Sequence, residues 1–136
     1  MPTNTKIITD ALMEIAVVAD GQTASASELA DGLTELNQMM AVWTIDDKNI
    51  GYFPQDTGSD TCPIPIWAEQ AVKTNLAVNL AAIFRVPVSP ETLVRAGNGL
   101  TFVAKKCINA KLEGVDNDHM PYGAPSTRWD ISTDSI

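Results

Sequence analysis

Hydrophobic residues recur at helical spacing in four separate stretches of the chain. The first runs from about residue 5 to residue 19 and ends at Asp20-Gly21, because glycine accepts the left-handed conformation that closes a helix. The second follows Ser25 and Glu28, whose spacing is typical of a capping box, and its apolar residues keep to one face as far as Trp43. The short turn between the two predicts an antiparallel helix pair.

The third stretch, residues 70–84, is apolar almost all the way round, yet it contains Asn75 and Asn79. Such a helix offers more apolar surface than one small core uses, so we expect part of it to be covered by a neighbouring molecule. Buried amides need hydrogen-bond partners. We therefore expect both asparagines to tie this helix to the loop that precedes it, residues 44–65.

The fourth helix is predicted to begin at Ser89-Pro90-Glu91 and to end at Glu113-Gly114. Serine is a good N-cap, proline is harmless at the first helical position, and an acid in the first turn complements the helix dipole. Gly97 and Gly99 lie inside this helix and cost about 1 kcal/mol each relative to alanine. The helix therefore either kinks there or meets another backbone closely.

Two long segments lack helical periodicity. Residues 44–65 form a loop of a length that is usually functional or disordered. Its apolar residues Ile50, Tyr52 and Phe53 can fold back onto the core or be covered by a partner, and a short hairpin is a further alternative. The second segment is the C-terminal one, which carries aromatic residues without any period.

These patterns predict an all-α fold. We expect a bundle of about four helices over residues 1–114, with the long loop between the second and third helices. Residues 115–136 are expected to form an extended C-terminal arm.

The net charge of −8 is unevenly distributed along the sequence. Residues 1–60 carry −8, residues 61–112 carry +4 and residues 113–136 carry −4. Binding to nucleic acid depends on lysine and arginine at the phosphates. Any contact with DNA is therefore expected from the basic middle segment.

Composition excludes several kinds of chemistry. The sequence shows no secretory signal and no apolar run long enough to span a membrane, so we expect a soluble protein made in the cytoplasm. Cys62 and Cys107 lack CxxC spacing and are expected to be free thiols. His119 is the only histidine, and no phosphate loop or dinucleotide fingerprint is present. We expect no metal and no cofactor.

Two functional alternatives rest on particular residues. A small cell-wall glycosidase could use carboxylates from Glu28, Asp31 or Glu35, although their spacing fits a solvated helix face better. A regulatory module could bind a cytosolic partner through Tyr52 and Phe53 together with Trp129 of the arm.

The order of the elements resembles the head-to-tail adaptor family of short-tailed bacteriophages, also called head-completion or tail accessory factors, or packaged-DNA stabilisation proteins. The motifs that carry the resemblance are G-x-x-x-S-x-x-E at residues 21–28, L-N-x-M at 36–39 with Trp43, A-x-x-x-N-L-A-x-x-L-A at 71–81 and V-S-P-E at 88–91.

The resemblance implies a structural virion protein and no enzyme. Copies would assemble as a ring, dodecameric by family resemblance, beneath the portal. The ring would close the DNA exit after packaging and provide the platform for the tail. The implied partners are the portal protein, a tail or nozzle protein and copies of the chain itself, with packaged DNA only peripheral and no membrane. The implied place is the head–tail junction of the virion.

The chemistry of particular residues suggests roles for them within such an assembly. The arm would dock on the portal through Tyr122, Arg128, Trp129 and Ile131. The loop would contact the tail or a neighbouring copy through Ile50, Tyr52 and Phe53. Asn75 and Asn79 would be polar anchors of the central helix, and the residues that could face the DNA channel are Arg85, Arg95, Lys105 and Lys106.

Overall fold

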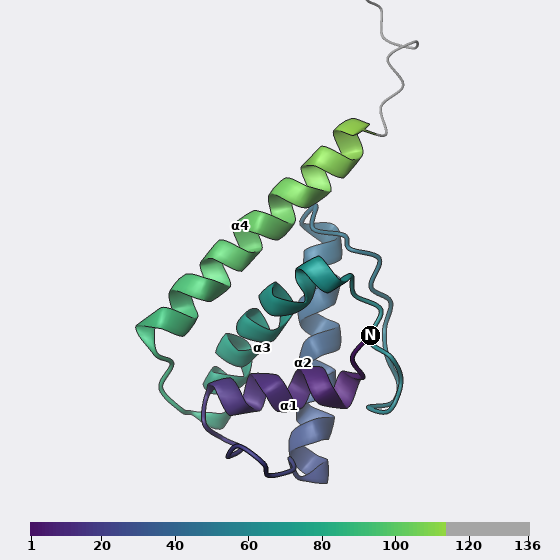
Figure 1. Ribbon diagram of the computed structural model, residues 1–136. Coiled ribbons are helices and arrows are strands. Elements are labelled where there is room, and N and C mark those ends of the chain that lie inside the picture. The colour runs from purple at the N-terminus through teal and green to yellow at the C-terminus, as the bar shows by residue number, and fades with distance from the viewer. Residues whose placement is uncertain (114–136) are drawn as a thin grey trace, which may run out of the picture.

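The computed structural model describes residues 1–113 and contains four α-helices (Figure 1). They are α1 (Asn4–Glu14), α2 (Ala26–Ile45), α3 (Glu69–Phe84) and α4 (Pro90–Glu113), with a short 3-10 helix, η1 (Ile66–Ala68), before α3. No strand forms within these 113 residues, so the predicted all-α bundle is confirmed. The predicted arm lies outside the described residues.

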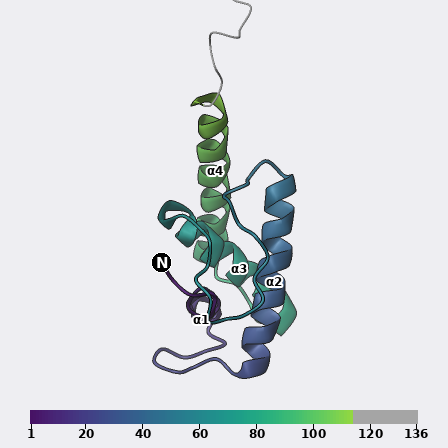
Figure 2. The same ribbon diagram turned by 90° about the vertical axis from the view of Figure 1, so that its right-hand side faces the viewer.

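Helix α3 occupies the centre of the bundle and contacts α1, α2 and α4 (Figures 1 and 2). Seven of its residues are buried: Ala71, Val72, Thr74, Leu76, Ala77, Leu80 and Ala81. Three helices of the same chain therefore cover most of the apolar surface of α3, and cover of the remainder by a neighbouring molecule stays a prediction. Among its large apolar side chains only Ile83 stays substantially exposed, at 47%.

The core forms where these helices meet. Ile7, Ile8 and Leu12 of α1 are fully buried, together with Leu36 of α2 and Val103 of α4. Each such side chain contributes roughly 1.5–3 kcal/mol on complete burial. The amphipathic pattern of the sequence thus correctly identifies the inward faces of α1 and α2 and the middle of the inward face of α4.

Helix α1 ends at Glu14, five residues before the predicted end. The reason is a left-handed Ala16 with a φ of 60°, which turns the chain back so that the Val17 N–H donates to the Leu12 carbonyl at 3.0 Å. Val18 is nevertheless only 5% exposed. The apolar pattern therefore continues past the helix as a buried turn, which periodicity alone does not distinguish from a helix.

The predicted N-caps of α2 and α4 are confirmed, whereas Gly21 does not close α1. The Ser25 hydroxyl accepts from the Glu28 N–H, and the Glu28 carboxylate accepts from the Ser25 N–H at 2.8 Å, which completes the capping box of α2. The Ser89 hydroxyl accepts from the Thr92 N–H at the start of α4. These short-range patterns depend on a few neighbouring residues, so the sequence specifies them well.

The long loop forms no hairpin. It runs from the end of α2 down to the N-terminus and back to α3 (Figure 1). Its second half pairs with the N-terminal segment: Thr61 forms an isolated antiparallel bridge with Thr3, and the Asn4 N–H donates to the Asp60 carbonyl at 2.9 Å. The backbone groups of the loop thus find partners in the first residues of the chain.

Helix α4 is only partly covered by the bundle. Its C-terminal end extends beyond the other helices in both views (Figures 1 and 2). Ala96, Val103 and Cys107 are buried as the pattern predicts, but Leu93 is 50% exposed and Ala110 is also exposed. The predicted apolar face of this helix is therefore right in its middle and wrong at both of its ends.

Gly99 of α4 faces α3 at close range. A Cβ atom built on Gly99 would lie 2.9 Å from the Ala71 Cβ and 3.0 Å from the Ala71 Cα. A Cβ at Gly97 would meet nothing within 4 Å. The expectation of a closely approaching backbone is therefore confirmed at Gly99 within this chain, and Gly97 faces open space.

We expect Gly99→Ala to lower the free energy of unfolding by about 1–3 kcal/mol, because α3 and α4 must separate to admit the methyl group. The matched variant Gly97→Ala should leave it unchanged or raise it by up to about 1 kcal/mol through helix propensity. Urea unfolding followed by circular dichroism measures both changes. Equal effects of the two substitutions would contradict the close approach.

A charged cluster joins α1 to α3. The Lys73 ammonium contacts Asp10 at 2.8 Å and Glu69 at 2.7 Å, and Lys6 contacts Asp10 at 2.6 Å. Partial burial alone would raise the pKa of Asp10, but the hydrogen bonds from Lys6 and Lys73 outweigh it and hold this pKa below its usual value. Ionised Asp10 therefore favours the folded state.

We expect Asp10→Asn to lower the free energy of unfolding by about 1 kcal/mol at pH 7, since the substitution removes a partly solvated charge-assisted contact. A carboxyl with a lowered folded-state pKa stabilises the protein above its unfolded pKa of about 3.9 and loses this effect as the pH falls through the folded pKa. The difference in the free energy of unfolding between the wild type and Asp10→Asn should therefore shrink in acid below about pH 4. Chemical unfolding at several pH values measures it, and Asp31→Asn, at an exposed position, is the control.

Candidate interaction surfaces

Asn37 of α2 fastens the first half of the long loop. Its side-chain oxygen accepts from the Tyr52 hydroxyl at 2.6 Å and from the Gln55 N–H at 2.9 Å. Its side-chain NH₂ donates to the Gln55 carbonyl at 2.9 Å. On the other side of the loop, the Asn4 amide donates to the Thr57 carbonyl at 2.8 Å and to the Gln55 side chain at 3.1 Å. Two asparagines thus hold the loop, and neither of them lies in residues 70–84, the helix that was expected to hold it.

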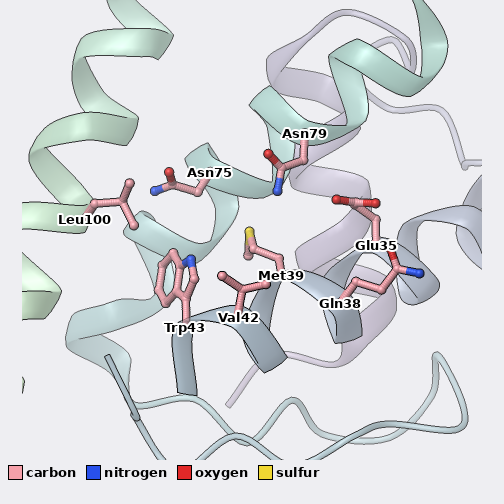
Figure 3. Close-up of a pocket in the computed structure, with 8 residues that line it drawn as sticks. All are labelled: Glu35, Gln38, Met39, Val42, Trp43, Asn75, Asn79 and Leu100. Atoms are coloured by element: carbon pink, nitrogen blue, oxygen red, sulfur yellow. The ribbon is translucent and has the colours of Figure 1, made fainter. Parts of the chain in front are cut away.

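The expected tie between the loop and the central helix is wrong. The Asn75 amide donates to the Ala96 carbonyl of α4 at 3.0 Å and to the Ala71 carbonyl one turn earlier in α3 at 2.8 Å. Asn79 is half-buried and faces a hollow between α2, α3 and α4 (Figure 3). The loop packs against α2 and the N-terminus, so it lies out of reach of these amides, and Asn75 joins α3 to α4.

The hollow has a volume of about 370 Å³ and is lined by Glu35, Gln38, Met39, Val42, Trp43, Asn75, Asn79 and Leu100 (Figure 3). Of the three carboxylates considered for a glycosidase, only Glu35 lines it. The Glu28 carboxylate instead caps α2, and Asp31 is exposed. The fold therefore does not gather these three carboxylates around one hollow.

The apolar residues of the loop divide between the fold and the surface. Tyr52 is half-buried with its hydroxyl on Asn37, and burial raises the pKa of this hydroxyl. Phe53 is 60% exposed. Ile50 is half-buried and lines a second hollow, described below. Of these three predicted contact residues, Phe53 is the one that the loop presents most fully.

The four basic residues predicted for a DNA channel do not form one cluster. Arg95 pairs with Glu14 of α1 at 2.8 Å. Lys106 lies over the Trp67 ring, with its ammonium 5.8 Å from the ring centre. Arg85 is exposed at the end of α3, and Lys105 lies about 15 Å further along α4 than Arg95.

A second hollow, which we call the Trp67 groove, was not predicted. Its volume is about 540 Å³, and its lining is mostly apolar: Asp47, Asn49, Ile50, Pro65, Trp67, Lys106, Cys107, Ala110 and Lys111. The Phe102 ring meets the Trp67 ring edge-on, with 6.1 Å between the ring centres. Phe102 and Lys106 are four residues apart on one helix, a spacing that indicates a shared face but does not identify Trp67 as its partner.

Side-chain contacts fix the walls of this groove. Lys111 of α4 pairs with Asp47 at 2.7 Å, beyond the end of α2. The Cys107 thiol donates to the Asn49 carbonyl at 3.6 Å. The groove is thus formed by three segments that lie far apart in sequence: the start of the long loop after α2, Pro65 with η1, and the projecting half of α4.

The cysteines are free, as predicted. Burial raises the pKa of the Cys62 thiol to about 11, which keeps it protonated at neutral pH. Among residues 1–113, no group of three or more histidine, cysteine, aspartate or glutamate side chains could hold a metal ion. None of the helices in this part of the chain is long and apolar enough to cross a membrane.

Large apolar side chains remain exposed on separate parts of the surface. They include Val42 and Ile45 on α2, Phe53 in the loop, Ile66 in η1, and Leu93, Val94, Phe102, Ile108 and Leu112 on α4. On a helix, Val94, Ile108 and Leu112 fall on one side, which we call the outer face of α4. Exposed apolar surface of this extent is typical of proteins that bind other proteins.

The fold and these surfaces define a small helical protein built for contact with other macromolecules. The chain belongs to the P22 tail accessory factor family, whose model matches residues 1–129. No curated protein matches the chain significantly. Membership in this family supports a structural role in a phage virion, in association with other virion proteins. The resemblance seen in the sequence is thereby confirmed.

We expect Asn37→Ala to release the loop, because it removes three hydrogen bonds and leaves buried partners without them. The free energy of unfolding should fall by about 2–3 kcal/mol, and amide exchange of residues 50–57 should accelerate. Hydrogen exchange with mass spectrometry measures the second effect. The control is Asn79→Ala. Asn79 belongs to α3 and faces the hollow rather than the loop, so this substitution should leave amide exchange in the loop unchanged.

Proposed function

We propose that the chain is a head-to-tail adaptor that forms a ring beneath the portal, closes the DNA exit after packaging and receives the tail. The observation that carries the proposal is the exposed apolar surface on two separate elements, the end of α2 and the outer face of α4. A monomer with a fully used core gains nothing from such surface, whereas an assembly buries it.

The separation of these two surfaces favours a ring over a two-fold dimer. A closed ring uses heterologous contacts, in which one patch of a subunit meets a different patch of the next. Val42 and Ile45 form one such patch, and Ile108 and Leu112 form the other. We infer that the α2 patch of one copy meets the outer face of α4 of its neighbour.

The proposed portal contact is the arm, through Tyr122, Arg128, Trp129 and Ile131. Helix α4 supports this proposal because it carries the chain away from the bundle before the arm begins (Figure 2). A segment that starts at the end of a projecting helix can reach a partner without displacing the packed core. The loop contributes Phe53 as the proposed contact with the tail or a neighbouring copy.

DNA has a minor part in this proposal. Arg85 and Lys105 are exposed and could face the channel of the ring, while Arg95 and Lys106 already contact Glu14 and Trp67. The contact with packaged DNA would therefore be peripheral and weakened by salt.

The test of the arm is its removal. We expect deletion of residues 120–136 to abolish binding to the portal ring of the same phage and to leave helical content unchanged, because the deletion spares every element of the bundle. Sedimentation with purified portal measures binding, and circular dichroism measures helicity. Undiminished portal binding after the deletion would refute the role of the arm.

The test of the ring contacts uses charged substitutions. We expect Val42→Glu or Ile108→Glu to prevent ring formation on the portal while the free protein stays folded, since both side chains are at least half exposed and a buried unpaired carboxylate opposes association. Electron microscopy of portal complexes measures ring occupancy. Ala30→Glu, at an exposed position near the start of α2, is the control. Complete rings with either charged variant would argue against these patches.

A further inference from the structure

The Trp67 groove has the chemistry of a peptide-binding surface. Its floor is apolar, formed by the side chains of Ile50, Pro65 and Ala110 beside the Trp67 ring. A hollow of about 540 Å³ is large enough to take several side chains, and Phe102, which contacts the Trp67 ring, is itself about half exposed. Aromatic and aliphatic anchors are the groups that such a surface favours.

The rim of the groove is basic. Two lysines and one aspartate line it, Lys106 and Lys111 against Asp47. Lys111 pairs with Asp47, and Lys106 lies over the Trp67 ring and forms no ion pair with any described residue. An acidic occupant therefore complements the rim.

We propose that the Trp67 groove binds residues 115–136 of the same chain before the protein meets its partner. This segment has four aspartates and one arginine, so its charge is opposite to that of the rim. It also carries Tyr122, Trp129 and Ile131, which suit the apolar floor.

The segment begins beside the groove. Ala110 and Lys111 line the groove, and α4 ends at Glu113, within one turn of them. Twenty-two residues span at most about 73–79 Å when extended, so every part of the segment can reach the groove. A tether this short gives an effective concentration in the millimolar range, and weak contacts then suffice for binding within one chain.

Duplex or single-stranded DNA is a poorer occupant. The Trp67 ring is already in contact with Lys106 over its face and with the Phe102 edge, so a base would have to displace one of them to stack. Asp47 also lines the groove and would repel phosphates. The observations therefore favour an acidic peptide.

The consequence rests on the proposed function. If the arm docks on the portal through Tyr122, Trp129 and Ile131, the groove and the portal compete for the same three side chains. The free chain would then hide its arm and its groove against each other, and arrival at the portal would release both together. The groove becomes available to a neighbouring copy or a tail protein only after docking.

Paramagnetic relaxation in the free full-length protein tests the proposal. A nitroxide is attached through Ser132→Cys; the native thiols are buried and react slowly. We expect the Trp67 indole signal and the Ala110 amide signal to lose most of their intensity relative to the reduced label. The Ala30 amide, about 25 Å along α2 from Asp47, should keep its intensity.

Substitutions and mixing define the outcomes that decide the proposal. The double variant Lys106→Gln/Lys111→Gln, or the variant Tyr122→Ser/Trp129→Ser/Ile131→Ser, should restore the Trp67 signal, whereas Lys6→Gln on α1 should not. Absence of broadening at Trp67 in the chain that carries the nitroxide and no further substitution would overturn the proposal. Broadening of the same size in a mixture of ¹⁵N-labelled chains without the nitroxide and unlabelled chains that carry it would identify a second copy as the occupant and overturn the proposal as well.

The same measurements separate this inference from the proposed function. No portal is present, so a chain that shows broadening but fails to bind portal refutes only the adaptor role. A chain that binds portal through its arm without any broadening refutes only the groove. A short DNA duplex added in a parallel titration should leave the Trp67 signal unchanged, and a shift of this signal would favour nucleic acid instead.

Discussion

The close approach of α4 to α3 is the constraint on which the rest of the structure depends. Gly99 lies against the backbone of Ala71, and the Asn75 amide bonds to the Ala96 carbonyl beside this contact. Any larger residue in place of Gly99 would push the two helices apart, and the Asn75 amide could then no longer reach the Ala96 carbonyl. The contact thus fixes both the distance between the helices and the position of α4 along α3. It also fixes how much of α4 remains beyond the bundle.

The projecting half of α4 determines where new surface is created. Because three helices of its own chain cover most of α3, much of the exposed apolar surface lies on α4, on the end of α2 and in η1. The Trp67 groove exists because α4 continues past α3 and faces the start of the loop there. A shorter α4 would remove Lys106, Cys107 and Lys111 from its wall, and the groove with them. The same contact at Gly99 therefore supports the core and positions the interaction surfaces.

What the sequence predicts well is set by near neighbours in the chain. The capping box at Ser25, the serine cap at Ser89 and the inward faces of the helices depend on spacings of three or four residues. Pairings across the fold were missed. Asn37 holds the loop and Asn75 holds α4, but both are asparagines in a helix, and nothing in their local sequence distinguishes their partners. The sequence around Trp67 likewise indicates only the start of a helix. Its partners Phe102 and Lys106 lie more than thirty residues away, and only the fold brings them beside it.

The division of aromatic residues between folding and binding follows from hydrogen bonding. Tyr52 has a hydroxyl that needs a partner when buried, and Asn37 provides one, so this aromatic residue belongs to the fold. Phe53 has no such requirement and projects from the same loop. Trp67 lies between the two cases, because Lys106 and Phe102 hold its ring while its remaining surface faces an apolar groove. A ring held in place before its partner arrives loses little conformational entropy on binding, which makes Trp67 a better anchor for a partner than the freely exposed Phe53.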